Sequence, residues 1–245
     1  MKQVHALERL EQGVLDDAVP LATLLRQVVV IGGRASSRAL QDWALQELKG
    51  YTDPNVELPD YRRCHALIQT DSRSGAWEAR GRTISVLDLP EGARKFVSEE
   101  VPIAFSVGKL QAMVSSAKPE EPIKLSPPGA AELARIMTYE QRGRGVLVES
   151  VYWSVHISVL QDILDQVRTR LAQFVAELRS AMSDGSDEPT ADQVHKAVQS
   201  IHITAGDNSP VNVTAPLAYA GQEAEATATA AADNQKRRLW PRRPQ

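Results

Sequence analysis

One uninterrupted helical pattern late in the chain, residues 154–182, constrains the fold most strongly. No glycine or proline interrupts it, and its large apolar residues recur at steps of three and four. These residues are Ile157, Leu160, Leu164, Val167, Leu171, Phe174, Leu178 and Met182. The spacing predicts an amphipathic helix roughly 40 Å long, with Ser158 and Gln161 as a capping pair at its start. Such a helix packs against the core of its own domain, and a heptad-like stripe is also typical of an oligomer interface.

The N-terminal part of the chain predicts three short helices joined by tight turns. Apolar residues one helical turn apart place them at 2–16, 20–33 and 37–49. Gly32-Gly33 and Gly50 follow the second and third apolar stripes, where glycine commonly ends a helix. We therefore expect a small N-terminal helical bundle.

The middle of the chain, from Tyr51 to Val155, mixes strand-like and helix-like stretches. Alternating apolar and polar residues predict two strands that form a hairpin across 71–75, and two later strands. The four strands are expected at 62–70, 77–86, 123–127 and 146–155. Helical spacing predicts helices at 90–100, 105–116 and 128–140. The expected fold class is α+β: an N-terminal helical bundle, a small mixed sheet and a long C-terminal helix.

The residues after 183 have a different composition, so we expect the folded domain to cover 1–183. Residues 184–197 have the composition of a linker, and 217–245 are low in complexity and end in a basic tail. Between them, 198–216 predicts a β-hairpin whose apolar residues are Ile201, Ile203, Val211 and Val213. Because an isolated hairpin is only marginally stable in water, we expect it to pair with the domain or with other copies of the chain.

Composition points to a globular protein in a reducing compartment. The 245 residues are 42% hydrophobic and carry a formal net charge of −3. Cys64 is the only cysteine, so no intrachain disulfide can form. The charged N-terminal residues lack the apolar core of a signal peptide, and the longest apolar run, 28–31, is far shorter than a membrane span. We expect a cytoplasmic protein without a membrane span.

No familiar catalytic or phosphate-binding motif occurs in the sequence. The five histidines fall in different predicted elements, so we expect no metal site and no cofactor. Cys64 and His65 are adjacent, but neighbouring residues of a strand point to opposite faces. They are therefore not expected to act as a catalytic pair.

Several arginines are candidates for binding anions or nucleic acid. Arg62, Arg63, Arg73, Arg80 and Arg82 would share a basic face if the predicted hairpin forms. The anion-binding candidates elsewhere are Arg142 and Arg144 in a predicted turn, and Lys236, Arg237, Arg238, Arg242 and Arg243 in the tail. A plain turn with two exposed arginines is the favoured interpretation of Arg142 and Arg144, and the slightly acidic net charge does not favour a nucleic-acid-binding surface.

Residues 38–62 contain the most distinctive motif, W-x3-EL-x-GY followed by ELP-x-YR. It is carried by Trp43, Glu47, Leu48, Gly50, Tyr51, Glu57, Leu58, Pro59, Tyr61 and Arg62. The motif resembles the signature of the AbiTii family of bacterial abortive-infection domains, and the wider similarity spans about residues 2–182. Lys49 departs from the family pattern, which has a small polar residue there. The resemblance implies an anti-phage role and assigns no catalytic residue.

From the residue types alone, we expect this motif to be structural. Trp43 and Leu48 would pack the third helix, Gly50 would supply a left-handed helix stop, and Pro59 would fix the loop. Tyr61 and Arg62 would then anchor the sheet.

Two functions remain open at this point. The first is a non-enzymatic defence component that assembles into homo-oligomers through the stripe of the long helix and the 198–216 hairpin. The second is a nucleic-acid-binding or nuclease-like effector that uses its arginine-rich face and basic tail. The tail also offers a site for a protein partner.

Overall fold

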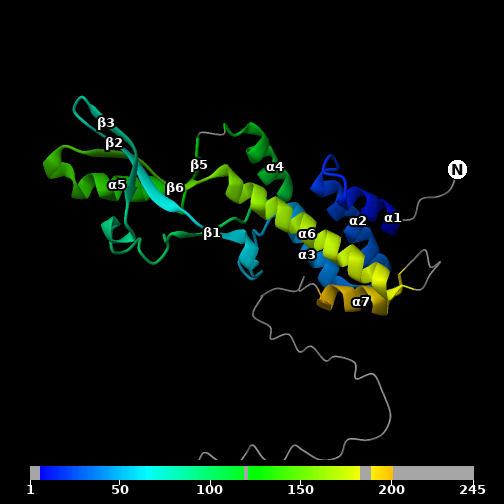
Figure 1. The fold of residues 1–245 in the computed structure, drawn as a ribbon. Coiled ribbons are helices and arrows are strands. Elements are labelled where there is room, and N and C mark those ends of the chain that lie inside the picture. Colours follow the sequence, from blue (N-terminus) through cyan, green and yellow to red (C-terminus); the bar gives the residue numbers. More distant parts are fainter. Residues whose placement is uncertain (1–5, 119–120, 183–188, 201–245) are drawn as a thin grey trace, which may run out of the picture. The chain divides into compact units, whose positions relative to one another are not determined.

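The computed structural model describes residues 6–118, 121–182 and 189–200, and these form the predicted α+β fold (Figure 1). The helices are α1 Ala6–Val14, α2 Leu21–Arg34, α3 Arg38–Lys49, α4 Val107–Ser116, α5 Ala130–Glu140, α6 Ile157–Ala181 and α7 Ala191–Ser200. The strands are β1 Arg63–His65, β2 Leu67–Ser74, β3 Trp77–Ile84, β4 Glu100–Pro102, β5 Ile123–Leu125 and β6 Leu147–Val155. Short 3-10 turns η1 Asp60–Arg62, η2 Val86–Asp88 and η3 Arg142–Arg144 complete the described elements.

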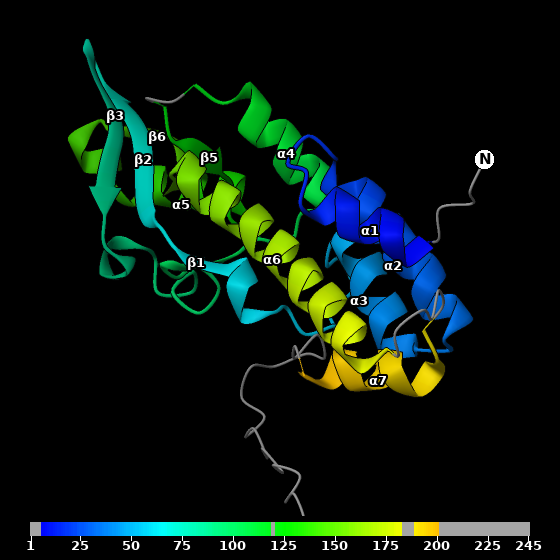
Figure 2. The ribbon, with the colours of Figure 1, turned by 45° about the vertical axis from the view of Figure 1, so that its right-hand side comes forward.

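The long helix α6 joins two hydrophobic cores. Its N-terminal half contributes Leu160 and Ile163 to a core formed with the sheet and α5. From Val167 onward it contributes Val167, Leu171 and Phe174 to a core formed with α1, α2, α3 and α7. Figures 1 and 2 show α6 running from the sheet to these helices. The sequence prediction of this helix is therefore confirmed.

The prediction that the apolar stripe of α6 forms an oligomer interface is wrong for most of its residues. Leu160, Val167, Leu171, Phe174 and Leu178 are all fully buried within the single chain. Leu164 is partly buried and packs against both cores. The bundle and the sheet supply the apolar surface that a partner helix would otherwise provide. His156, rather than Ser158, caps the helix, because its Nδ1 accepts from the Ser158 amide at 3.2 Å.

The glycine pair in α2 lies inside the helix rather than at its end. A Cβ at Gly32 would lie 2.9 Å from the Gln41 Cγ, and one at Gly33 would lie 2.9 Å from the Gln41 Nε2. The two glycines therefore allow α3 to approach α2 closely, and the helix continues to Arg34.

Arg168 of α6 fixes the end of the first helix. Its guanidinium donates to the carbonyl oxygens of Gly13, Val14, Asp16 and Val19 at 2.8 to 3.3 Å. The last carbonyls of a helix have no partner within it, so this contact satisfies them and ties α1 to α6.

The main sheet is antiparallel with strand order β3-β2-β6-β5, and α5 packs on β6. The predicted strand 62–70 is split in two, because β1 pairs separately with β4. In the β2–β3 pair, the register shifts between Thr70 and Ser72, opposite Gly81. Gly81 has φ +66°, which is typical of a glycine bulge.

The helix predicted at 90–100 does not form. Leu89 and Val97 are buried in the sheet core at the two ends of this loop. The Arg94 guanidinium donates to the carbonyl oxygens of Leu87 and Leu89, each at 2.9 Å. These contacts hold the segment as a series of turns that leads into β4.

Part of the predicted 184–197 linker is helix α7. Val194, Ala197 and Val198 lie at helical spacing and are buried in the core of the bundle. Thr190 and Gln193 form a reciprocal capping box at its start, with distances of 2.8 and 3.4 Å. The remainder of the predicted 198–216 hairpin, with Ile201, Ile203, Val211 and Val213, lies outside the described residues, as does the 217–245 tail.

Within the described part of the chain, none of the helices combines the length and the apolar character that crossing a membrane requires.

Candidate functional site

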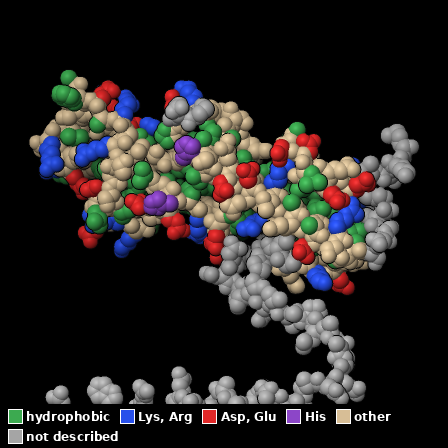
Figure 3. Space-filling view, in the orientation of Figure 1, with side chains coloured by type: hydrophobic (Ala, Val, Ile, Leu, Met, Phe, Trp, Pro, Cys, Tyr) green, Lys and Arg blue, Asp and Glu red, His purple; other side chains and the backbone are tan. Residues whose placement is uncertain are grey.

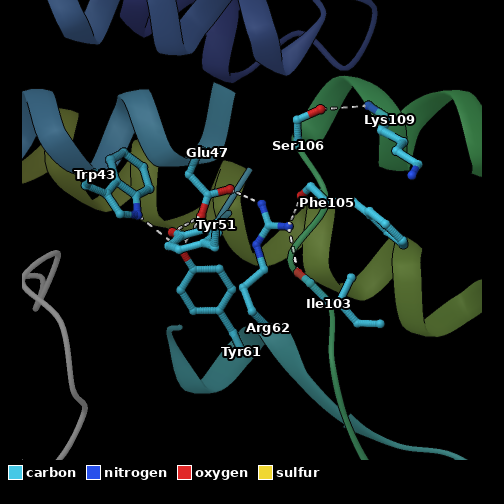
Figure 4. Close-up of polar contacts among 9 residues, drawn as sticks. All are labelled: Trp43, Glu47, Tyr51, Tyr61, Arg62, Ile103, Phe105, Ser106 and Lys109. Carbon is cyan, nitrogen blue, oxygen red and sulfur yellow. Dashed lines mark hydrogen bonds and ion pairs between the residues drawn. The ribbon is translucent and has the colours of Figure 1, made fainter. Parts of the chain in front are cut away.

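The residues of the tryptophan–tyrosine–arginine motif converge on one buried carboxylate (Figure 4). Trp43 and Glu47 lie on α3, Tyr51 follows the end of that helix, and Tyr61 and Arg62 lie on η1. The Glu47 and Arg62 side chains are both 0% exposed. The motif thus builds a closed polar centre, which we call the Glu47 centre: Trp43, Glu47, Tyr51, Tyr61 and Arg62.

Most polar groups of the Glu47 centre have a defined partner, whereas Arg62 Nε is buried without a hydrogen-bond partner among the described residues. Tyr51 Oη and Tyr61 Oη both donate to Glu47 Oε1 at 2.7 Å. Arg62 Nη2 forms an ion pair with Glu47 Oε2. The Trp43 indole Nε1–H donates to Tyr61 Oη at 3.0 Å and orients that ring. The glutamate therefore accepts three side-chain hydrogen bonds in a site closed to water.

The second guanidinium nitrogen of Arg62 reaches a segment far along the chain. Nη1 donates to the Phe105 carbonyl oxygen at 2.6 Å and to the Ile103 carbonyl oxygen at 3.3 Å. The Arg62 carbonyl oxygen in turn accepts from the Ile103 amide at 2.7 Å. Arg62 thus holds residues 103–106, the segment that leads from β4 into α4.

Gly50 brings the end of α3 against the same segment. Its φ is +90°, and a Cβ at this position would lie 2.7 Å from the Ala104 carbonyl oxygen. That oxygen accepts from the Tyr51 amide at 2.9 Å. A residue with a side chain fits here neither by backbone conformation nor by space.

The electrostatics of the Glu47 centre keep its tyrosines protonated. Burial, and then the negative charge of Glu47, raise the pKa of Tyr51 and of Tyr61 above the ordinary tyrosine value. The Arg62 guanidinium lies 5.4 Å from the centroid of the Tyr51 ring. The Arg170 guanidinium lies 4.3 Å from that of Tyr61. The two hydroxyls therefore remain hydrogen-bond donors at neutral pH.

The other motif residues surround this centre without joining it. Leu48 is partly buried against the core of the bundle, as predicted. The Pro59 carbonyl oxygen accepts from the Arg62 amide at 2.9 Å and starts η1. Leu58 is half-buried, and Glu57 is exposed.

A second carboxylate centre, which the sequence did not predict, lies on the sheet. Asp71 of β2 accepts at Oδ1 from the Gly81 amide at 2.8 Å and from Tyr152 Oη at 2.9 Å. Its Oδ2 accepts from Lys124 Nζ at 2.7 Å and from Ser150 Oγ at 3.2 Å. These donors come from β3, β5 and β6, so the Asp71 centre (Asp71, Gly81, Lys124, Ser150 and Tyr152) ties all four strands together. The sequence feature that could have indicated this centre is Gly81, a glycine inside the predicted strand 77–86.

The charge of Asp71 is stabilised by its partners. Burial raises the pKa of this carboxyl, but the hydrogen bonds from Lys124, Gly81 and Tyr152 outweigh burial and lower the pKa to about 2. The hydrogen bond to Asp71 raises the pKa of Lys124 in return. A carboxylate has about four acceptor sites, and four donors occupy those of Asp71.

The predicted arginine-rich face is only partly present. Arg62 is not part of it, because its side chain is buried in the ion pair with Glu47. The side chains of three others pair with carboxylates: Arg63 with Glu100 at 3.2 Å, Arg73 with Glu149 at 3.3 Å and Arg80 with Glu78 at 3.3 Å. Arg82 is exposed on β3. The ion pairs reduce the positive potential that a nucleic-acid-binding face requires.

The remaining candidates do not form a site with these residues. The Arg142 guanidinium lies 3.9 Å from the centroid of the Tyr139 ring, and Arg144 is exposed in the same turn. Anion binding there stays a prediction, and the basic tail lies outside the described residues. Cys64 is half-buried against the sheet core, whereas the neighbouring His65 is exposed. In the part of the chain that the structure describes, no three His, Cys, Asp or Glu side chains group so as to hold a metal ion.

Comparison with known proteins gave one match. The model of the family named AbiTii matches residues 6–204, which include the motif, both cores and α7. The match thus extends beyond residue 183. No curated protein and no solved structure matches the chain significantly.

Proposed function

The chain belongs to the AbiTii family, and on that premise we propose that it acts as a non-enzymatic, self-assembling component of the defence. Family membership implies a bacterial abortive-infection role, in which an infected cell stops growing or dies and phage propagation ends with it. The proposal concerns how this chain contributes to that outcome.

The observation that carries the proposal is that both carboxylate centres use their acceptor groups within the chain. Glu47 is fully buried and accepts from two tyrosines and an arginine. Asp71 accepts from four donors. A general base needs a lone pair within reach of a substrate proton, and a general acid needs a proton to donate at neutral pH. A structural role for both centres fits this geometry better than a catalytic one.

Exposed aromatic and aliphatic side chains support the assembly part of the proposal. Trp77 is 82% exposed on β3, and Phe96 and Leu87 are 75% and 74% exposed on the loop that Arg94 closes. These side chains stand on ordered elements, so covering them with a partner costs this chain little conformational entropy. Large aromatic residues are typical anchors of protein interfaces.

Phage challenge of bacteria that express the full chain tests the defence role. We expect protection at a low phage-to-cell ratio and loss of the culture at a high ratio, because infected cells do not survive. An Asp71→Asn chain that stays folded should protect as the wild type does. Loss of protection in that folded variant would contradict the non-enzymatic proposal.

Sedimentation of the purified full chain tests assembly. We expect a species larger than the 26.9 kDa monomer at micromolar concentration. A monomer at all concentrations would contradict self-assembly. Nucleic acid that binds with an affinity falling steeply with salt would instead favour the nucleic-acid-binding alternative.

A further inference from the structure

We infer that the free edge of β3 pairs with β3 of a second copy, antiparallel and centred on Ala79. This inference rests on the proposed self-assembly and assigns it a specific surface. It makes the assembly unit a two-fold symmetric dimer with one sheet running across both chains.

Among the described residues, no strand pairs with the outer edge of β3. β3 is the terminal strand of the sheet, with β2 on its other side. Residues 77–80 are all exposed. Figures 1 and 2 both show the tip of the β2–β3 hairpin clear of the other elements. The outer edge of such a strand carries backbone N–H and C=O groups that can pair with another strand.

The charges of β3 are self-complementary when the two-fold axis passes through Ala79. In that register, Glu78 lies opposite Arg80 of the second copy, and Arg80 lies opposite its Glu78. Opposite charges directly across an antiparallel pair stabilise it, and like charges destabilise it. Within one chain, these two side chains already approach to 3.3 Å and are about 60% exposed, so both remain accessible to a partner.

Neighbouring two-fold registers place like charges together. An axis through Arg80 would bring the two Arg80 side chains opposite each other, and would also place Glu78 opposite Arg82 of the second copy. An axis through Gly81 would bring Arg80 opposite Arg82 of the second copy. Of these three registers, only the one centred on Ala79 has opposite pairs and no like pair, so the charges of β3 favour it.

The same register gives the exposed tryptophan a partner. Trp77 lies beside the Gly81 bulge of the second copy, where regular pairing ends, and its ring can cover the backbone that the glycine exposes. The space-filling view shows hydrophobic, acidic and basic side chains gathered at this end of the hairpin, at the upper left (Figure 3). The two symmetric Trp77–Gly81 contacts would cover apolar surface that is 82% exposed in the single chain.

The geometry favours a closed dimer over an open fibre. The bulge at Gly81 limits regular pairing to a short stretch of β3. The opposite edge of the sheet, β5, is only three residues long. Two-fold pairing through β3 uses the same edge of both copies and leaves only short edges exposed.

A charge-exchange experiment on the full chain tests the register. The dimer dissociation constant is measured by analytical ultracentrifugation over a concentration series for the wild type, Glu78→Arg, Arg80→Glu and the double variant. Each single substitution places two like-charge pairs across the interface and should weaken the dimer by about tenfold or more. The double variant restores both opposite pairs and should return the dissociation constant to within about threefold of the wild type.

Cross-linking tests the geometry independently. In a Cys64→Ser background, Ala79→Cys places the two introduced thiols directly opposite each other, at a separation that a disulfide can bridge. Thr83→Cys is the matched control, because it is exposed on the same strand but lies far from its own copy in this register. Mild oxidation should yield a covalent dimer of the Ala79→Cys chain and leave the Thr83→Cys chain monomeric.

The outcomes separate this inference from the proposed function. A chain that remains monomeric at all concentrations would contradict both. A chain that assembles normally, but shows no effect of the charge exchange and no preferential cross-linking at position 79, would contradict only the β3 interface.

Discussion

The Glu47 centre and the Asp71 centre are built from similar groups but differ in their surroundings. Each places a carboxylate against a cation and at least one tyrosine hydroxyl. Glu47 and Arg62 are both 0% exposed, whereas Lys124 of the Asp71 centre is 49% exposed. If its carboxylate partner is removed, the half-exposed Lys124 ammonium can be hydrated by water. The fully buried Arg62 guanidinium cannot. The difference shows that burial, more than the number of hydrogen bonds, sets how much the fold depends on each centre.

The two centres also connect different parts of the molecule. The Glu47 centre links α3 and η1 to residues 103–106, which lead into a helix that contributes to both cores. The Asp71 centre links strands that already pair along their backbones. Loss of the Glu47 centre therefore removes a connection that the backbone supplements through the Tyr51 and Ile103 amides and the short β1–β4 pair.

The largest effect is expected from Glu47→Ala. It leaves the Arg62 guanidinium buried without its counter-charge, which typically costs about 3–5 kcal/mol. Denaturant unfolding of the purified chain should show this loss in the free energy of unfolding, or the variant should fail to fold. Arg63→Ala is the matched control, because it breaks the exposed pair with Glu100 and should cost less than about 1 kcal/mol. Equal losses of unfolding free energy in the two variants would contradict the claim that a buried ion pair matters more than an exposed one.

Gly50→Ala should have the next largest effect, at about 2–4 kcal/mol, because strain at positive φ adds to the contact with the Ala104 carbonyl. Gly75→Ala is the control for positive φ without a close contact. Gly75 also has positive φ, at +57°, but a Cβ there would meet no atom within 4 Å. It should therefore show only the conformational cost of about 1 kcal/mol. A loss at Gly50 no larger than at Gly75 would mean that the close approach to residues 103–106 is unimportant.

Asp71→Asn should cost about 1–2 kcal/mol in the free energy of unfolding at neutral pH, because an amide replaces a carboxylate that accepts from four donors. The pKa of Asp71 is depressed to about 2 in the folded chain. Its contribution to stability is therefore complete above the unfolded pKa of about 4 and is lost as the pH falls from about 4 to 2. Over this range, the wild type should lose more stability than Asp71→Asn, as measured by denaturant unfolding at each pH. Parallel pH profiles of the two proteins would contradict this account.

Lys124→Met should have the smallest effect, below about 1 kcal/mol, since the half-exposed ammonium is replaced by a side chain that still covers the Tyr152 ring. The same measurement serves as the test. A loss as large as that of Glu47→Ala would show that the sheet depends on its exposed polar centre as strongly as the core depends on the buried one.

Local patterns predicted most of the elements around these centres. The apolar stripe of α3 and the glycine after it, and the alternation of β6 followed by the period of α6, are signals carried by neighbouring residues. The partners of Arg62 could not be predicted in this way. They are backbone carbonyls 41 and 43 residues away. Every residue has a backbone carbonyl, so the residue types do not show which one a side chain will contact.

Tertiary packing overrode the sequence pattern in three places. The heptad-like stripe of α6 is buried by its own chain, because the sheet and the bundle together cover the apolar face along the length of the helix. Residues 90–100 form turns because Leu89 and Val97 are held in the core. Helix α7 was missed because polar residues surround a short apolar face, although Thr190 and Gln193 gave a capping-box signal.

Hydrogen exchange of the full chain tests most directly whether the Glu47 centre holds residues 103–106 against α3. The amides of Tyr51 and Ile103 report on this contact, because they donate to the carbonyl oxygens of Ala104 and Arg62. In Glu47→Gln, we predict that these two amides lose more protection than the paired amides of β2 and β6. A uniform loss across all of these amides, or unchanged protection at Tyr51 and Ile103, would contradict the account.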